Sequence, residues 1–276
     1  MKKLRCAIFL TLAVIVFAAC SPHNLGTYVL TSPSPVLDRI QQRGELVVGT
    51  AAGMPPLNMT ARNGTIIGLD ADLAQILADA MDVVLRLEPM AFEDLLPSLE
   101  AGKVDLVISG MTMTVYRNRR VAFAGPYLIS GKGLLTREAT LAAIEDPGAI
   151  DLARIRLTAL AGSTSADFIR SAAPKAQFMP ARDYDEAVKM VIDGRVDAMV
   201  ADHPICLVSL ARYPGQGLLA VVAPLTHEPI GIALPANDAL FINLVENFLT
   251  ALHDSGTLER LKEQWFQKGD WWDQLK

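Results

Sequence analysis

Three apolar runs of this sequence are each followed by residues that can bind a small zwitterion. These residues are Ser109, Gly110, Thr112 and Arg117 after the first run, Ser163 and Thr164 after the second, and Asp202 and His203 after the third. The guanidinium of Arg117 is a planar fork that fits a carboxylate. Free amides at Ser163 and Thr164 would add an anion site at a helix start. Because the Asp202 carboxylate can hold an ammonium group, the set predicts a site for an amino acid or a similar zwitterion.

Each of these residues also has a purely structural interpretation. Arg117 can be a solvated charge, and Ser163 with Thr164 can cap a helix. Asp202 can start the next helix beside Pro204. Their joint position favours binding, because ligands of open α/β sheets lie beyond the carboxyl ends of the strands.

The elements that position these residues alternate between strands and helices. Apolar runs predict buried strands at 46–49, 106–109, 157–160 and 198–201, and periodic patterns predict helices at 69–80, 92–101 and 183–193. One helix face is expected to carry Leu69, Leu73, Ile76, Leu77 and Ala80, and Asn63-Gly64 is expected to form a hairpin turn. The alternation predicts an α/β fold with parallel-rich sheets flanked by helices.

A repeat within the chain predicts two such sheets. The helix expected at 92–101 ends at Gly102 and is followed by Lys103-Val104-Asp105 and an apolar run. The helix expected at 183–193 ends at Gly194 and is followed by Arg195-Val196-Asp197 and another apolar run. A single copy is also an ordinary way to leave a helix. Two copies in matching context predict two α/β lobes.

The first twenty residues resemble a bacterial lipoprotein signal. A basic start precedes an apolar run, 7–17, that is too short to span a bilayer and ends in Phe17-Ala18-Ala19-Cys20. In that family the peptide is cut before the cysteine, which then carries lipid. We therefore expect a signal peptide at 1–19, lipidation of Cys20, a tether at 20–36, and a protein anchored to a membrane in the periplasm or at the cell surface. An ordinary secretory signal and an uncleaved anchor are the alternatives.

Composition excludes several other classes of function. The formal net charge of −5 becomes three units more negative once Lys2, Lys3 and Arg5 leave with the signal, which argues against a nucleic-acid partner. Of the three cysteines only Cys206 would remain free in the folded part, in an apolar run where burial is expected. The four histidines lack metal-ligand spacing, and GxSxG and HExxH motifs are absent from the sequence. We expect no metal, no cofactor and no catalytic residue.

From about Leu37 to Phe266 the chain resembles the bacterial extracellular solute-binding proteins of family 3, which deliver polar amino acids to ABC importers. The matching segments are 43–50, Pro55-Pro56, 68–73, 96–99, 102–105, 111–114 with Arg117, Pro126-Tyr127, and 194–197 with Asp202. The resemblance implies a two-lobed periplasmic-binding-protein fold of type II, with lobe 1 at 37–130 and 229–276 and lobe 2 at 131–228. Crossovers near 129–133 and 226–229 would form the hinge.

The same resemblance implies roles for single residues. Arg117, Thr112 and the Thr164 amide would hold the ligand carboxylate. Gly110 and Asp202 would hold the amino group. Phe92 would stack on the ligand side chain. The implied partners are an amino acid and an ABC permease in the inner membrane.

Two departures from the family pattern bear on the ligand. Met54 stands where the family has an aromatic residue before Pro-Pro, and Ala51 stands where some members have an acid for cationic side chains. Because an unpaired buried charge is strongly unfavourable, we expect a neutral, partly apolar amino acid. A dehydratase on the same scaffold, resembling cyclohexadienyl dehydratases with Asp202 or His203 as acid or base, and a ligand-sensing module are the alternatives.

Overall fold

The computed structural model describes residues 33–146 and 154–275, and its folded body begins at Pro33. The predicted signal peptide, Cys20 and most of the predicted tether lie outside the described residues. Helix α2 (Pro35–Arg43) includes the last two residues of that tether, because Pro35 suits the first turn of a helix. None of the helices in the described ranges has the length and apolarity needed to cross a bilayer.

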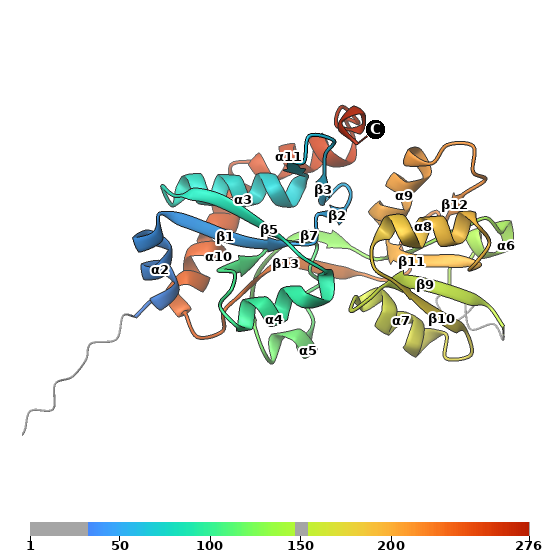
Figure 1. The fold of residues 1–276 in the computed structure, drawn as a ribbon, viewed down its shortest axis with the longest axis horizontal. Coiled ribbons are helices and arrows are strands. Elements are labelled where there is room, and N and C mark those ends of the chain that lie inside the picture. The colour runs from blue at the N-terminus through green and yellow to red at the C-terminus, as the bar shows by residue number, and fades with distance from the viewer. Residues whose placement is uncertain (1–32, 147–153, 276) are drawn as a thin grey trace, which may run out of the picture. The chain divides into compact units, whose positions relative to one another are not determined.

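The first sheet has the strand order β5-β1-β6-β13-β7 (Figure 1). Its strands are β1 (Glu45–Thr50), β5 (Val84–Pro89), β6 (Leu106–Val107), β7 (Ala122–Ser130) and β13 (Glu228–Leu234). Strand β1 pairs in parallel with β5 and β6, with Val48 opposite Leu106, whereas β13 runs antiparallel to β6 and β7. The sheet is therefore mixed.

Helices and a small second sheet surround this first sheet. The helices are α3 (Leu69–Ala80), α4 (Leu95–Glu100), α5 (Val115–Asn118), α10 (Ala239–Asp254) and α11 (Thr257–Phe266), with 3₁₀ turns at Phe92–Asp94 and Trp272–Gln274. The small sheet joins β2 (Gly53–Met54), β3 (Asn58–Thr60) and β4 (Ile66–Ile67). The expected turn at Asn63-Gly64 connects its antiparallel strands β3 and β4.

The other large sheet has the strand order β10-β9-β11-β8-β12. Its strands are β8 (Lys132–Thr136), β9 (Arg156–Leu160), β10 (Gln177–Ala181), β11 (Ala198–Asp202) and β12 (Leu219–Ala220). Its helices are α6 (Ala139–Ala142), α7 (Thr164–Ala172), α8 (Tyr184–Ile192) and α9 (His203–Arg212). Strands β10, β9 and β11 are parallel, whereas β8 and β12 are antiparallel neighbours. The two-sheet α/β prediction is confirmed.

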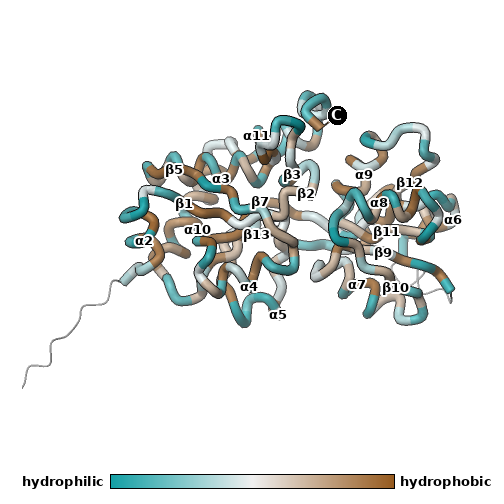
Figure 2. Tube along the Cα trace, in the orientation of Figure 1, coloured by the Kyte–Doolittle hydropathy of each residue, from teal (hydrophilic) through white to brown (hydrophobic). Residues whose placement is uncertain are grey.

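Strand β1 shows why its sequence is continuously apolar. Leu46 and Val48 belong to a core formed with α3 and α10, whereas Val47 packs with Leu95 and Leu99 of α4. Figure 1 shows α3 and α4 on opposite sides of this sheet, and Figure 2 shows β1 as a largely hydrophobic strand. A strand covered on both faces needs apolar residues at successive positions.

The repeated Gly-basic-Val-Asp segment has the same structural role in both lobes. Asp105 accepts a hydrogen bond from the Val47 amide at 2.9 Å, and Asp197 accepts one from the Arg156 amide at 2.7 Å. Gly102 and Gly194 both have a φ of +67°. Each aspartate thus fixes the chain that leaves a helix to a neighbouring parallel strand of its own sheet, β1 or β9.

Local differences from the predicted elements have physical reasons. The helix expected at 92–101 begins as the 3₁₀ turn before α4, and Pro97 lies in the first turn of α4, where its missing N–H is tolerated. The face expected on α3 is buried at Leu69, Leu73 and Leu77, but Ala80 is exposed at the helix end.

The C-terminal tryptophans pack on the first lobe. Trp265 donates a hydrogen bond to Asp72 of α3 at 2.7 Å. Trp271 donates to the Trp265 carbonyl at 3.1 Å and stacks on Trp272 with ring centroids 4.4 Å apart. These contacts hold the end of the chain against α3.

A buried carboxylate at the start of α3 predicts a pH dependence. Asp70 accepts hydrogen bonds of 2.7 Å from Tyr127 and from Asn58, and burial raises the pKa of Asp70 from 3.8 to about 6. An acid with a raised pKa in the folded state stabilises the fold below its unfolded pKa, and this contribution is lost as pH rises through the folded value.

We expect the free energy of unfolding of the wild type, relative to Asp70→Asn, to fall by about 2 kcal/mol between pH 4 and pH 6.5. Urea unfolding of both proteins at several pH values measures this difference. The variant also loses a hydrogen-bond acceptor, but that loss is independent of pH. Parallel curves for the two proteins would contradict the assignment.

Candidate functional site

The chain passes between the two large sheets twice, at Gly131 and between β12 and β13. The Lys132 amide donates to the Thr226 hydroxyl at 2.9 Å, and the Leu225 amide donates to the Lys132 carbonyl at 2.7 Å. A Cβ on Gly131 would lie 1.9 Å from the Thr226 carbonyl oxygen. The two crossovers therefore run in contact, at the positions that the family resemblance implied.

Residues of the two lobes also meet beyond the ends of the strands. The hydroxyl oxygens of Thr112 and Thr164 lie 3.2 Å apart, and Arg117 Nη2 donates to the Gly162 carbonyl at 3.4 Å. Gly162 is packed so closely that a Cβ there would lie 2.7 Å from the Cβ of Glu93. The sequence-predicted positions Thr112, Arg117 and Thr164 are thus brought together in space.

Arg117 is a buried cation of this region. Its residue is 8% exposed, Nη1 donates to the Thr112 carbonyl at 2.9 Å, and the guanidinium lies 5.6 Å from the centroid of the Phe92 ring. Within residues 33–146 and 154–275 its guanidinium contacts carbonyl oxygens and this ring but forms no ion pair. Burial lowers the pKa of Arg117, and more distant carboxylates partly oppose that shift. A buried guanidinium in such a setting favours an anionic ligand.

The short helix α5 positions Arg117. Thr114 caps this helix, and its hydroxyl accepts a hydrogen bond from the Arg117 amide at 3.1 Å. The neighbouring side chains Val115 and Tyr116 are exposed, whereas Arg117 turns inward toward Thr112 and Phe92. The interpretation of Arg117 as a solvated surface charge is therefore wrong.

Ser163 acts as a helix cap in this structure. Its hydroxyl donates to the Leu160 carbonyl at 2.7 Å and accepts from the Ala166 amide at 3.2 Å. Its own amide donates to the Leu160 carbonyl at 3.2 Å, so the expectation of a free Ser163 amide is wrong. Thr164, the next residue, instead directs its hydroxyl toward Thr112.

Three other predicted residues, Ser109, Gly110 and Met54, pack closely together. The Ser109 hydroxyl accepts from the Ala51 amide at 2.9 Å and donates to the Met54 sulfur at 3.8 Å. Gly110 has a φ of +55°, and a Cβ there would lie 2.8 Å from Leu57 and 3.0 Å from Met54. Met54 is 2% exposed. In this structure Ser109 and Met54 serve internal packing rather than an open surface.

Asp202 belongs to an ionic cluster that the sequence analysis missed. Lys132 Nζ lies 2.9 Å from Asp202 Oδ1, 2.7 Å from Glu228 Oε2 and 2.8 Å from the Thr164 hydroxyl. The sequence does contain one signal for this cluster. It is a lysine at the start of the apolar strand β8, beside a predicted crossover. Glu228 likewise lies in the other predicted crossover.

A cavity of about 360 Å³ adjoins Arg117. Phe92, Arg117 and Thr164 line it together with Glu93, Leu96, Pro97, Met111, Thr114, Tyr116, Arg120, Gly162 and Asp167. Of the predicted site residues, Phe92, Arg117 and Thr164 therefore line this cavity. Met54, Ser109, Gly110, Thr112, Ser163 and Asp202 do not.

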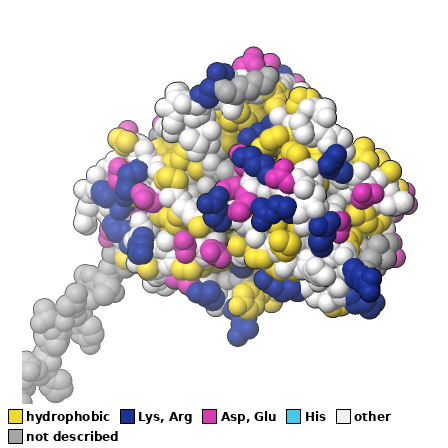
Figure 3. All heavy atoms as spheres, turned by 45° about the vertical axis from the view of Figure 1, so that its right-hand side comes forward, with side chains coloured by type: hydrophobic (Ala, Val, Ile, Leu, Met, Phe, Trp, Pro, Cys, Tyr) yellow, Lys and Arg dark blue, Asp and Glu magenta, His cyan; other side chains and the backbone are white. Residues whose placement is uncertain are grey.

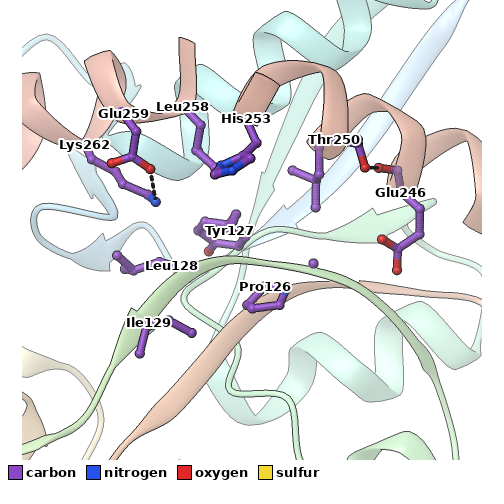
Figure 4. A pocket seen from close by; sticks show the side chains of 12 residues that line it. Pro126, Tyr127, Leu128, Ile129, Glu246, Thr250, His253, Leu258, Glu259 and Lys262 are labelled. Carbon is purple, nitrogen blue, oxygen red and sulfur yellow. Dashed lines mark hydrogen bonds and ion pairs between the residues drawn. The ribbon is translucent and has the colours of Figure 1, made fainter. Parts of the chain in front are cut away.

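A second hollow lies in the first lobe, between β7 and the helices α10 and α11 (Figure 4). Pro126, Leu128 and Ile129 are on its strand side. Its charged pair, Lys262 and Glu259, is joined at 2.8 Å, and Thr250 donates to a carbonyl of its own helix. It contains none of the predicted ligand residues.

The described residues offer little for metal or nucleophile chemistry. Within them, groups of three or more His, Cys, Asp or Glu that could hold a metal are absent. Cys206 is fully buried, which confirms its expected burial, and burial raises the pKa of its thiol. His203 Nε2 lies 3.1 Å from the Val221 carbonyl. On the face drawn in Figure 3, acidic and basic side chains are interspersed, which provides no broad field for a polyanion.

Comparisons with known proteins show the family of this chain. Residues 46–268 match the family of bacterial extracellular solute-binding proteins, family 3. The L-cystine-binding protein TcyJ of Escherichia coli (strain K12) is 26% identical over 84% of this chain and 86% of its own length. The cyclohexadienyl dehydratase of Pseudomonas aeruginosa is 27% identical over 88% of this chain and 90% of its own.

A solved structure supports the same family assignment. The crystal structure of a putative binding component of an ABC transporter from Wolinella succinogenes, complexed with lysine, is 33% identical, with a TM-score of 0.79 over 84% of this chain and 99% of that one. The protein therefore belongs to the bacterial extracellular solute-binding proteins, family 3.

Proposed function

We propose that this protein binds an amino acid outside the cytoplasm and delivers it to an ABC importer. The observation that carries this proposal is the buried Arg117 guanidinium, which forms no ion pair in the described part of the chain and lies where the two lobes meet. Relatives named as binding proteins for cystine and arginine support it.

The ligand is expected to be held by both lobes. Arg117 and Thr112 belong to the first lobe, and the N-terminus of α7 at Thr164 belongs to the second; together they would hold the carboxylate. Asp202, at the end of β11, would hold the ammonium group. Contacts from both lobes favour the closed form, because only a ligand that binds that form more tightly shifts the equilibrium.

We infer that the ligand side chain is neutral and partly apolar. Ala51 supplies no carboxylate for a cationic side chain, and Met54 and Phe92 form an apolar cluster nearby. Asp202 is already paired with Lys132. The relative complexed with lysine shows only that this family includes members that take a basic amino acid.

Calorimetric titration with leucine, methionine, glutamine, lysine and arginine tests this proposal. We expect at least one neutral amino acid to bind more tightly than either basic one, by about tenfold or more, because an uncompensated charge in the closed cleft is costly. Tighter binding of lysine or arginine would refute the preference. Failure of every amino acid to bind would refute the function itself.

The proposed role is binding rather than catalysis. Most of the relatives named above are binding proteins, although one is a dehydratase. Both residues considered as an acid or base are engaged: Asp202 pairs with Lys132, and His203 contacts the Val221 carbonyl. Turnover of prephenate or arogenate by the purified protein would favour the dehydratase instead.

We also propose that Cys20 is the lipid-anchored N-terminus of the mature protein, as its lipoprotein-like signal indicates. Two or more acyl chains at ~0.8 kcal/mol per buried methylene would hold the protein on a membrane. We expect the wild type to partition into detergent and Cys20→Ala to remain in the aqueous phase. An unacylated, aqueous wild type would exclude the anchor.

A further inference from the structure

The ionic cluster around Lys132 lies next to the groups proposed to bind the ligand. Lys132 is 1% exposed, and its ammonium has three acceptors, on Asp202, Glu228 and Thr164, all between 2.7 and 2.9 Å. An ammonium group has three donors. Lys132 is therefore held in one position by a full set of hydrogen bonds.

The cluster leaves one acceptor unused. Asp202 receives Lys132 on Oδ1, and within the described residues its other carboxylate oxygen accepts no hydrogen bond, not even from the helix that Asp202 caps. Both oxygens of Glu228 are engaged: Oε1 accepts from Thr226 at 3.1 Å, and Oε2 accepts from Lys132. The free oxygen of Asp202 thus belongs to the residue proposed to hold the ligand ammonium.

The net charge of the cluster determines how many ammonium groups of a ligand it can neutralise. Two carboxylates and one ammonium leave one net negative charge, which a single incoming ammonium would neutralise. Unpaired charge in a closed, dry site is strongly unfavourable, so both excess and deficit of positive charge are penalised. Glu228 and Lys132 come from different crossovers, so this balance is built where the lobes join.

We propose that Lys132 and Glu228 together set the number of ammonium groups that this end of the site accepts, and that the number is one. The proposal rests on the proposed amino-acid binding function and names specificity-determining residues for it. Lys132 neutralises one of the two carboxylates of the cluster, and the other remains available to the ligand.

Substitutions that change the cluster charge test this directly. Lys132→Met removes the ammonium but keeps a long apolar side chain, which leaves two uncompensated carboxylates. Glu228→Gln removes one carboxylate and leaves the cluster neutral. The double variant Lys132→Met/Glu228→Gln restores one net negative charge.

Three ligands with the same three-carbon skeleton measure the response. Lactate, alanine and 2,3-diaminopropionate carry none, one and two amino groups, and their affinities can be compared by calorimetry. We expect Lys132→Met to shift the affinity ratio toward 2,3-diaminopropionate over alanine by about tenfold or more, as for a charge-assisted hydrogen bond. Glu228→Gln should shift the affinity ratio of lactate to alanine toward lactate by a similar factor. The double variant should return to the preference of the wild type.

Controls separate this proposal from other effects. Lys103→Met, at an exposed position of the first lobe, should leave all ratios unchanged. If Lys132→Met fails to fold, Glu228→Gln and the double variant still decide the matter. Ratios that stay within about threefold in variants that bind alanine would overturn the proposal. A wild type that binds none of the amino acids titrated above would instead refute the proposed function.

Discussion

Replacing Arg117 with alanine is expected to weaken amino-acid binding by about 2 to 5 kcal/mol, the usual cost of removing one partner of a buried, hydrogen-bonded charge pair. The guanidinium is already desolvated by the protein, with Phe92 on its face and the Thr112 carbonyl on one nitrogen. A ligand carboxylate would complete an ion pair that the described residues leave unmade. Calorimetry on the wild type and the variant measures the loss.

Two further variants show whether the fork or merely the charge is required. Arg117→Lys keeps the charge but loses the planar pair of donors, so we expect little recovery of affinity. Arg120→Ala is the matched control, since Arg120 lines the same cavity but is exposed and ion-paired with Glu100. Arg117 would be excluded from the site if Arg117→Ala bound as tightly as the wild type.

The fold was predictable where the pattern reflects local physics. The run at β1 is apolar at successive positions because both faces of the strand are covered, which sequence alone can show. The helix start at Asp183 was readable because a capping side chain acts within one turn, and its carboxylate does accept from the Glu186 amide at 2.7 Å. The repeated Val-Asp was visible, but its role of holding a strand amide required the structure.

The site was only partly predictable, because its main cluster depends on contacts between distant segments. Lys132 and Glu228 are separated by almost the whole second lobe, and nothing local to either residue indicates that they meet. Because lysines are rarely buried, the residue type of Lys132 alone does not indicate a buried ion pair. Ser109 and Ser163 have the right residue type at the right strand ends, yet hydrogen bonds with Ala51, Leu160 and Ala166 occupy their hydroxyls.

Gly131→Ala is expected to destabilise the protein by about 3 kcal/mol or more, at the upper end of the usual cost of overpacking. The added Cβ would lie 1.9 Å from the Thr226 carbonyl oxygen and 2.8 Å from Pro224, and backbone cannot rotate aside as a side chain can. The two crossovers would have to separate. That movement would stretch the hydrogen bond from the Lys132 amide to Thr226 and displace Lys132 from Glu228.

Chemical unfolding and ligand titration of the same variant distinguish a hinge effect from general instability. Gly53→Ala is the matched control, because the nearest atom to its added Cβ, the Ala51 carbonyl oxygen, lies 3.9 Å away. We expect Gly53→Ala to unfold within about 1 kcal/mol of the wild type. Gly131→Ala should also bind ligand more weakly under conditions where it is still folded, since closure requires the crossovers to stay in contact. Wild-type stability in Gly131→Ala would show that the two strands separate without cost, and the hinge would then not depend on their contact.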